Sequence, residues 1–162
     1  MKRIGILSDT HGFLDPRIWH NLESCDEIWH AGDIGNIETY DKLLDFKPLK
    51  IVFGNIDGHE LRRVCKEDLC FECEGHRIYM THIGGYPGRY NQRAKPIILQ
   101  EKPDLFICGH SHILKIMPDP KLNLLHINPG AAGNHGFHQI KTLVRLSLAP
   151  KKIFDVEVIE LS

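Results

Sequence analysis

Residues 3–12 have the sequence RIGILSDTHG, and this stretch decides how the rest of the chain is interpreted. The run Arg3–Leu7 has the length of a strand and no polar alternation, which is typical of a strand buried on both faces. It ends in loop 8–12, where Asp9 and His11 place a carboxylate and an imidazole two residues apart. In open α/β sheets ligands bind beyond the carboxyl ends of the strands, so this loop is a candidate binding site.

Five further apolar runs end in the same way, in small or polar residues. The runs are Glu27–His30 before Ala-Gly-Asp, Leu49–Phe53 before Gly-Asn, Arg77–Thr81 before His-Ile-Gly-Gly, Leu105–Cys108 before Gly-His-Ser-His, and Leu122–Ile127 before Asn-Pro-Gly.

Two segments between the first three strands favour helices. Segment 16–23 follows the start signal Asp15-Pro16, and segment 37–46 places apolar residues on one face.

The second half of the chain is predicted to be richer in strands than the first. A helix is expected within 87–100, beginning near Arg89 and interrupted around Pro96. Further strands are predicted at 113–117, 139–148 and 153–161. Helices between the early strands and strands later on favour the α/β class with mixed strand order. Because no repeat or linker interrupts the chain, we expect one domain over 1–162.

Composition limits the classes of partner. The chain has 162 residues, of which 42% are hydrophobic and 25% charged, as in ordinary globular domains. Its formal net charge of -1 predicts no long-range attraction to nucleic acid or to an anionic membrane. A phosphate-bearing substrate would need local attraction, which bound cations supply. The edges of the later strands could pair in a homo-oligomer.

Targeting and redox signals point to the cytoplasm. The apolar run after Arg3 stops at Ser8, too short for a signal sequence, and no stretch has the length of a membrane span. The five cysteines form no secreted framework. Cys65, Cys70 and Cys73 have a spacing like that of zinc or iron–sulfur ligands. Positions 70 and 73 of a strand face opposite sides, however, and a fourth ligand is missing, so free thiols are expected.

Seven potential metal ligands follow the predicted strands. A carboxylate with two oxygens bridges two ions readily, and Asp33 stands where such a ligand is needed. Mixed imidazole and carboxylate ligation suits manganese, iron, zinc, cobalt or nickel better than calcium or magnesium. The seven residues are Asp9, His11, Asp33, Asn55, His82, His110 and His112.

The order of these ligands resembles the calcineurin-like metallophosphoesterase superfamily. The motifs on which this resemblance rests are Asp-x-His, Gly-Asp, Gly-Asn, a lone His and Gly-His-x-His, each at a strand end. The small size, His-Ala-Gly-Asp at 30–33 and Asn-Pro-Gly at 128–130 resemble its compact phosphodiesterase branch. The resemblance implies two facing mixed β-sheets flanked by helices, a four-layer αββα sandwich.

The resemblance also implies the roles of the ligands. One metal ion would be held by Asp9, His11, Asp33 and His112, and the other by Asp33, Asn55, His82 and His110. The implied reaction is hydrolysis of a small phosphate ester by in-line attack of a hydroxide that bridges two divalent ions, with manganese the expected metal. Asp33, Asn55 and His82 are the candidate catalytic residues. A phosphomonoesterase is an alternative, and so is a protein-binding scaffold, because a retromer coat subunit has the same fold.

One position departs from the family pattern. Many members have a histidine after Gly-Asn that handles a proton, and this chain has Ile56. A missing general acid commonly costs on the order of 10²–10⁴ in rate, and least when the leaving group is already stable as an anion. We therefore expect a preference for activated or aryl diesters. His59 is a candidate substitute, although it is also expected to begin a helix.

The remaining candidates lie near the proposed ligands. Arg89 and Asn55 are candidate substrate-binding residues, because an arginine after the His82 loop could clamp a phosphate. The alternative for Arg89 is a solvated helix face. His30 is expected to pack or form hydrogen bonds beside the site. The other histidines are expected to be structural or solvated, although loop 133–136 could line the pocket.

Overall fold

The computed structural model describes residues 1–161 and contains two five-stranded mixed sheets. In the first sheet, with strand order β12-β11-β1-β2-β3, the three strands β1, β2 and β3 are parallel, while β11 and β12 pair antiparallel. Its strands are β1 (Lys2–Leu7), β2 (Glu27–His30), β3 (Leu49–Ile51), β11 (Thr142–Ala149) and β12 (Lys152–Glu160).

The second sheet has the order β4-β5-β8-β10-β9, in which β5, β8 and β10 are parallel. The strands at its two edges, β4 and β9, pair antiparallel. Its strands are β4 (Asp68–Cys73), β5 (His76–Thr81), β8 (Leu105–Ile107), β9 (Lys115–Asp119) and β10 (Leu124–Asn128).

The two sheets face each other across an apolar core. Ile4, Ile6 and Val144 of the first sheet pack in one buried cluster with Met80 and Ile107 of the second. Because side chains alternate along a strand, the neighbouring residues of each strand face outward toward the helices. The core therefore accounts for the near-continuous apolar runs seen in the sequence.

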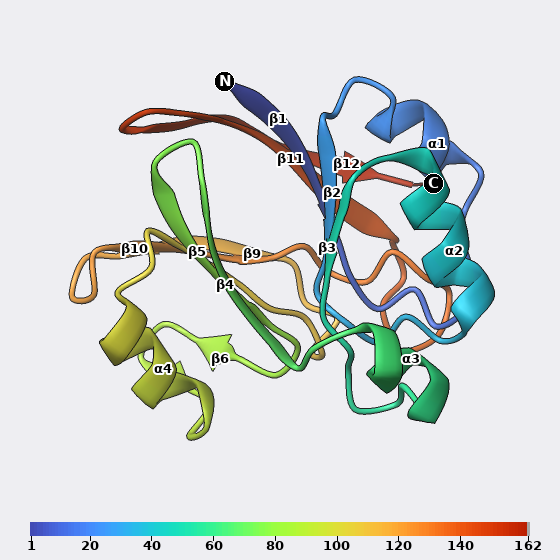
Figure 1. Cartoon of the computed structure of the whole chain (residues 1–162), viewed down its shortest axis with the longest axis horizontal. Coiled ribbons are helices and arrows are strands. Elements are labelled where there is room, and N and C mark those ends of the chain that lie inside the picture. Colours follow the sequence, from blue (N-terminus) through green and yellow to red (C-terminus); the bar gives the residue numbers. More distant parts are fainter. Residues whose placement is uncertain (162) are drawn as a thin grey trace.

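Helices cover the outer faces of both sheets (Figure 1). On the first sheet, α1 (Arg17–Leu22) and α2 (Ile37–Phe46) bury Leu22 and Leu43, and α3 (His59–Val64) packs near β3. On the second sheet, α4 (Ala94–Glu101) buries Ile98 against the strands. The predicted four-layer arrangement of helices and two mixed sheets is thus confirmed.

The expected helix at 87–100 is wrong in its first half. Arg89–Tyr90 forms the short strand β7, which pairs with β6 (Gly85–Tyr86), and the helix begins only at Ala94. Pro96 does not interrupt the helix, because it lies in the first turn, where its missing N–H has no intrahelical partner to lose. Within residues 1–161, no helix is long and apolar enough to span a membrane.

Cys70 and Cys73 lie in one strand, β4, as the sequence predicts. Strands β4 and β5 are joined by a two-residue turn, with Cys70 exposed and Cys73 buried. In the described part of the chain all five cysteines are free. Neither of the two groups of potential metal ligands in residues 1–161 includes a cysteine.

Candidate metal centre

The carboxyl ends of the parallel strands of both sheets meet at one edge of the sandwich. Backbone hydrogen bonds hold the loops there together: the amide of Asp9 donates to Gly32, and that of Gly109 donates to His82, both over 2.9 Å. All seven candidate ligands lie in these loops. Asp9 and His11 follow β1, Asp33 follows β2, Asn55 follows β3, His82 follows β5, and His110 and His112 follow β8.

The candidate ligands form two adjoining groups. In each group every residue offers one ligand atom within 4.8 Å of those of the others. The first group is Asp9, His11 and His112, and the second is Asp33, His82 and His110. Asn55 joins the second group, since its Oδ1 lies 3.0 Å from Nδ1 of His110.

Asp9 is fully buried, and its two carboxylate oxygens have different surroundings. Oδ2 accepts hydrogen bonds from the Ser8 hydroxyl, at 2.7 Å, and from the backbone amide of His110, at 3.1 Å. Oδ1 has no hydrogen-bond donor and lies 3.2 Å from Nε2 of His112. One oxygen therefore orients the carboxylate, while the other is free to bind a cation.

Asp33 lies between the two groups. Its Oδ1 accepts from the backbone amide of Ile56 at 3.1 Å. Its Oδ2 lies 3.2 Å from Nε2 of His82 and 3.4 Å from Nε2 of His11, one imidazole from each group. A carboxylate oxygen in this place is suited to a ligand shared by two ions.

The imidazole of His82 is oriented for metal binding. Its Nδ1 donates to the carbonyl of Ala31 over 2.8 Å, which leaves Nε2 with its lone pair directed at the carboxylates. Nε2 of His82 and Nε2 of His11 are buried and have no hydrogen-bond partner. Buried polar atoms are rarely left unpaired, and histidine ligands usually donate their second N–H to a carbonyl or carboxylate. The donor set therefore fits divalent transition-metal ions.

The backbone at the candidate ligands is strained. Five of the seven have φ between 48° and 75°, in the left-handed region that residues with a side chain seldom adopt. Each such position costs on the order of 1 kcal/mol and persists only where the surroundings hold it, commonly at a functional site. The five are Asp9, His11, Asp33, His110 and His112.

Close packing of loops explains two of the glycines. A Cβ at Gly54 would overlap both the carboxylate and the backbone nitrogen of Asp33, and a Cβ at Gly109 would overlap the side chains of Ser8 and Asp9. These glycines allow the loops after β3 and β8 to approach the carboxylates directly. The Gly-Asn and Gly-His motifs thus have a steric basis.

Charge interactions keep both carboxylates ionised. Burial alone would raise the pKa of Asp9, but its contacts with His112 and His82 outweigh burial and lower it. Asp33 behaves in the same way through His82. In turn, the carboxylates outweigh burial at His82 and raise its pKa, whereas burial dominates at His11 and lowers its pKa. The centre thus sets two ionised carboxylates among four imidazoles.

Asp57 organises two of the ligand loops, although sequence reasoning assigned it no role. Its buried carboxylate accepts backbone hydrogen bonds from Ile34, Gly35 and Gly54 over 2.8–3.0 Å. It therefore ties the loop that carries Asp33 to the loop that carries Asn55. The only available signal was its place just after Gly-Asn.

His30 and Asn128 support the site from behind. As expected, His30 lies beside it: its Nδ1 accepts from the amide of Gly32 and its Nε2 is 3.0 Å from the Thr10 hydroxyl. Burial lowers the pKa of His30 to about 4, so the ring is neutral. The amide of Asn128 donates to Gly109 and Ser111, which steadies the loop after β8.

The other candidates have different surroundings. Arg89 is exposed and lines a cavity that also contains His110. His59 begins α3 and is exposed, and Ile56 is half exposed on a cavity shared with Asp33. His135 stacks on His11, with ring centres 4.7 Å apart, so loop 133–136 does line the site.

Comparison with known proteins assigns the family. Residues 1–151 match the calcineurin-like phosphoesterase superfamily domain, and the chain belongs to that superfamily. A probable metallophosphoesterase of Mycoplasma pneumoniae is 30% identical over 165 residues, covering 96% of each chain. Another, from Methanothermobacter thermautotrophicus, is 28% identical over 135 residues, covering 79% of this chain and 76% of the relative. The resemblance found in the sequence is thereby confirmed, and the chain is a phosphoesterase-family protein that binds metal.

Solved structures share the fold. Vps29 of Chaetomium thermophilum superposes with a TM-score of 0.79 at 15% identity, covering 99% of this chain and 97% of that one. A structure described as a novel archaeal phosphodiesterase superposes with a TM-score of 0.74 at 22% identity, covering 97% and 99%. At these identities the likeness concerns the fold alone.

Proposed function

We propose that this protein is a phosphodiesterase that hydrolyses small phosphate esters with two divalent transition-metal ions, manganese being the expected metal. The observation that carries the proposal is the position of Asp33 Oδ2, 3.2 Å and 3.4 Å from the unpaired Nε2 atoms of His82 and His11. These two imidazoles belong to separate ligand groups. A shared carboxylate between two groups is what a pair of closely spaced ions requires.

The seven residues divide between the two ions. Asp9, His11, Asp33 and His112 would hold one ion, and Asp33, Asn55, His82 and His110 the other. When bound, such ions supply Lewis-acid charge to phosphoryl oxygens and lower the pKa of a water molecule.

The chain's own residues position the reactants. The Ala31 carbonyl holds the tautomer of His82, and the Ile56 amide fixes the rotation of the Asp33 carboxylate. Asn55 places a neutral amide at the rim, where it serves both as a ligand and as a contact for phosphate. Arg89 adds a positive charge on the side of His110.

The leaving group receives little help from the protein. Ile56, where many relatives have a proton-handling histidine, is half exposed beside Asp33 and cannot transfer a proton. Esters whose leaving group is stable as an anion lose least from this absence. Aryl diesters are therefore the preferred test substrates.

A protein-binding scaffold is the competing function, since Vps29 proteins share the fold. The set of seven donors favours the enzyme. Protein binding alone requires neither unpaired buried imidazoles nor carboxylates held on loops with left-handed backbone. The archaeal phosphodiesterase with this fold also supports hydrolysis of diesters. A phosphomonoesterase would use the same centre, and turnover of matched esters distinguishes the two.

The test is hydrolysis of bis(4-nitrophenyl) phosphate with added Mn²⁺. We expect Asp33→Asn and His82→Ala to lower kcat/KM by about 10³-fold or more, because several kcal/mol of charge stabilisation are lost and each 1.36 kcal/mol is tenfold. His20→Ala, an exposed histidine on α1, is the matched control and should retain activity. If folded, manganese-loaded protein hydrolyses neither this diester nor 4-nitrophenyl phosphate, the enzymatic proposal is wrong.

A further inference from the structure

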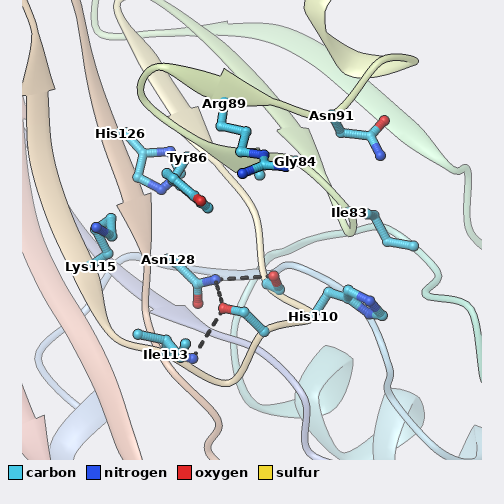
Figure 2. Close-up of a pocket in the computed structure, with 13 residues that line it drawn as sticks. Ile83, Gly84, Tyr86, Arg89, Asn91, His110, Ile113, Lys115, His126 and Asn128 are labelled. Carbon is cyan, nitrogen blue, oxygen red and sulfur yellow. Dashed lines mark hydrogen bonds between the residues drawn. The ribbon is translucent and has the colours of Figure 1, made fainter.

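A cavity of about 480 Å³ adjoins the candidate metal centre. Of the seven candidate ligands, His110 alone lines it. Figure 2 shows Arg89, Tyr86, His126 and Lys115 toward the left of the view and His110 toward the lower right. The cavity lies between the β6–β7 hairpin and strands β9 and β10. A group attached to a phosphate at the metal centre could extend into it past His110.

His126 lines this cavity, and both of its ring nitrogens are buried and unpaired. The side chain is only 1% exposed, and among residues 1–161 neither nitrogen has a hydrogen-bond partner. Its ring packs against Phe106, with ring centres 5.7 Å apart. Burial, assisted by the charge of Lys115, lowers the pKa of His126 to about 4, so the ring is neutral and carries one donor and one acceptor. Such atoms in a cavity wall are suited to a polar ligand.

The rest of the cavity is aromatic, apolar and positively charged. Tyr86 is 45% exposed, and Nζ of Lys115 lies 5.3 Å from the centre of its ring. Ile83 and Ile113 contribute apolar wall. Within the described chain, Lys115 and Arg89 form no ion pair with an acidic residue, so their charges are available to an anion.

We propose that this cavity binds the nucleoside of a nucleotide phosphodiester, with the base beside Tyr86 and in hydrogen-bond contact with His126. A nucleobase is planar and apolar on its faces, and its edge carries donors and acceptors, which matches both features of the cavity. Arg89 and Lys115 complement the diester anion. An alkyl substituent would leave His126 unpaired, and a bare second phosphate would not use the apolar wall. The inference rests on the proposed phosphodiesterase function.

The test compares two esters with the same leaving group, thymidine 5′-(4-nitrophenyl phosphate) and ethyl 4-nitrophenyl phosphate. In both, a bond forms between the water oxygen and phosphorus, the bond from phosphorus to the nitrophenyl oxygen breaks, and the water protons pass to solvent. The nucleoside or ethyl group stays on the phosphate. Any difference in KM between the two therefore reports on the cavity and not on the chemistry.

Tyr86→Ala should raise KM for the thymidine ester about tenfold, because stacking of a base on an aromatic ring contributes on that order. KM for the ethyl ester should change less than about twofold. The matched control is Leu99→Ala, an exposed apolar residue on α4 that lies outside the cavity. Equal effects on both esters, or no effect on either, would overturn the proposal.

His126→Leu is a second variant, in which stability should rise while the preference for the thymidine ester falls. Replacing two unpaired buried nitrogens by an apolar side chain should raise the melting temperature while it lowers the preference for the thymidine ester. Lys115→Ala should raise KM for both anionic esters, and Lys121→Ala, outside the cavity, should not. A His126→Leu protein that is folded and keeps the full preference would contradict the assigned role of His126.

Binding without turnover separates this inference from the proposed function. In metal-free protein, thymidine 5′-monophosphate should shift the ring ¹⁵N resonances of His126, which are assigned by their loss in His126→Leu. If the ethyl ester is hydrolysed but the resonances do not move, the nucleoside proposal fails and the phosphodiesterase stands. If the resonances move but neither ester is hydrolysed, the cavity proposal stands and the enzymatic function fails.

Discussion

At the scale of single residues, the candidate centre depends on groups that only hold other groups in place. Asp57 illustrates this, because its carboxylate accepts three backbone amides from two ligand loops and touches none of the seven donors through those bonds. An acidic side chain in such a place neutralises no cation. Its role is to replace the hydrogen bonds that two sharply bent loops cannot make with each other.

We expect Asp57→Ala to destabilise the metal-free protein by about 3 kcal/mol or more, since three amides lose their acceptor and each unmade buried bond costs about 1–3 kcal/mol. Mn²⁺ affinity should fall about 10–100-fold, as for other residues that orient metal ligands. Urea unfolding and titration calorimetry measure the two effects. Asp45→Ala, exposed on α2, is the control. Unchanged Mn²⁺ affinity in folded Asp57→Ala protein would exclude the positioning role.

Sequence could predict which residues gather but not how they are held. Asp9, Asp33 and His82 are predictable because each follows a buried strand, and the ends of parallel strands meet. The contacts of Asp57 and Asn128 arise between loops that are distant in sequence, so no local pattern encodes them. The left-handed backbone at Asp9 and Asp33 is likewise imposed by tertiary contacts.

At the scale of elements, the sequence predicts helices and strands best where a local signal coincides with a buried face. Segment 37–46 forms a helix at the predicted bounds, with Asn36 as its N-cap accepting from Thr39. The β6–β7 hairpin was missed, because two-residue strands carry no periodicity and depend on contacts across the turn. The error has a functional consequence, since the hairpin carries Tyr86 and Arg89 into the cavity.

The start of α1 gives a prediction about acid stability. The side chain of Asp15 accepts hydrogen bonds from the guanidinium and the amide of Arg17, and Nζ of Lys141 lies 3.3 Å away. The Arg17 side chain, followed by its amide and Lys141, lowers the pKa of Asp15 to about 2 from 3.8. A lowered pKa in the folded state gives stability that is complete above about pH 4 and is lost as the pH falls toward 2.

Asp15→Asn should therefore lower the free energy of unfolding at pH 7 by about 1–2 kcal/mol, and the difference from wild type should shrink between pH 4 and pH 2. Urea midpoints across this range measure it. Asp45→Asn, an exposed change on α2, is the control for the substitution itself. A constant gap between Asp15→Asn and wild type down to pH 2 would mean that the ionised carboxylate is not the stabilising species.

At the scale of the whole molecule, the apolar core stabilises the folded state and the candidate centre destabilises it. The sheets pack through a continuous buried cluster, whereas the edge where they meet concentrates strained backbone, paired carboxylates and unpaired imidazoles. The free energy gained by burying the core therefore offsets the strain and unpaired groups of the centre while no cation is bound. Cations that bind only the folded chain would relieve part of that cost and join the loops of both sheets.

We expect Mn²⁺ to stabilise the folded protein measurably. At a concentration about 100 times Kd the gain is about 2.7 kcal/mol. For a domain of this size that gain corresponds to a rise in melting temperature of about 5–10 °C. Thermal unfolding followed by circular dichroism across a Mn²⁺ series measures the rise. Asp33→Asn should lose most of it because Asp33 serves both groups, and His20→Ala should keep it. A melting temperature that does not depend on Mn²⁺, in protein that calorimetry shows to bind the ion, would mean that the seven residues are not its folded-state ligands.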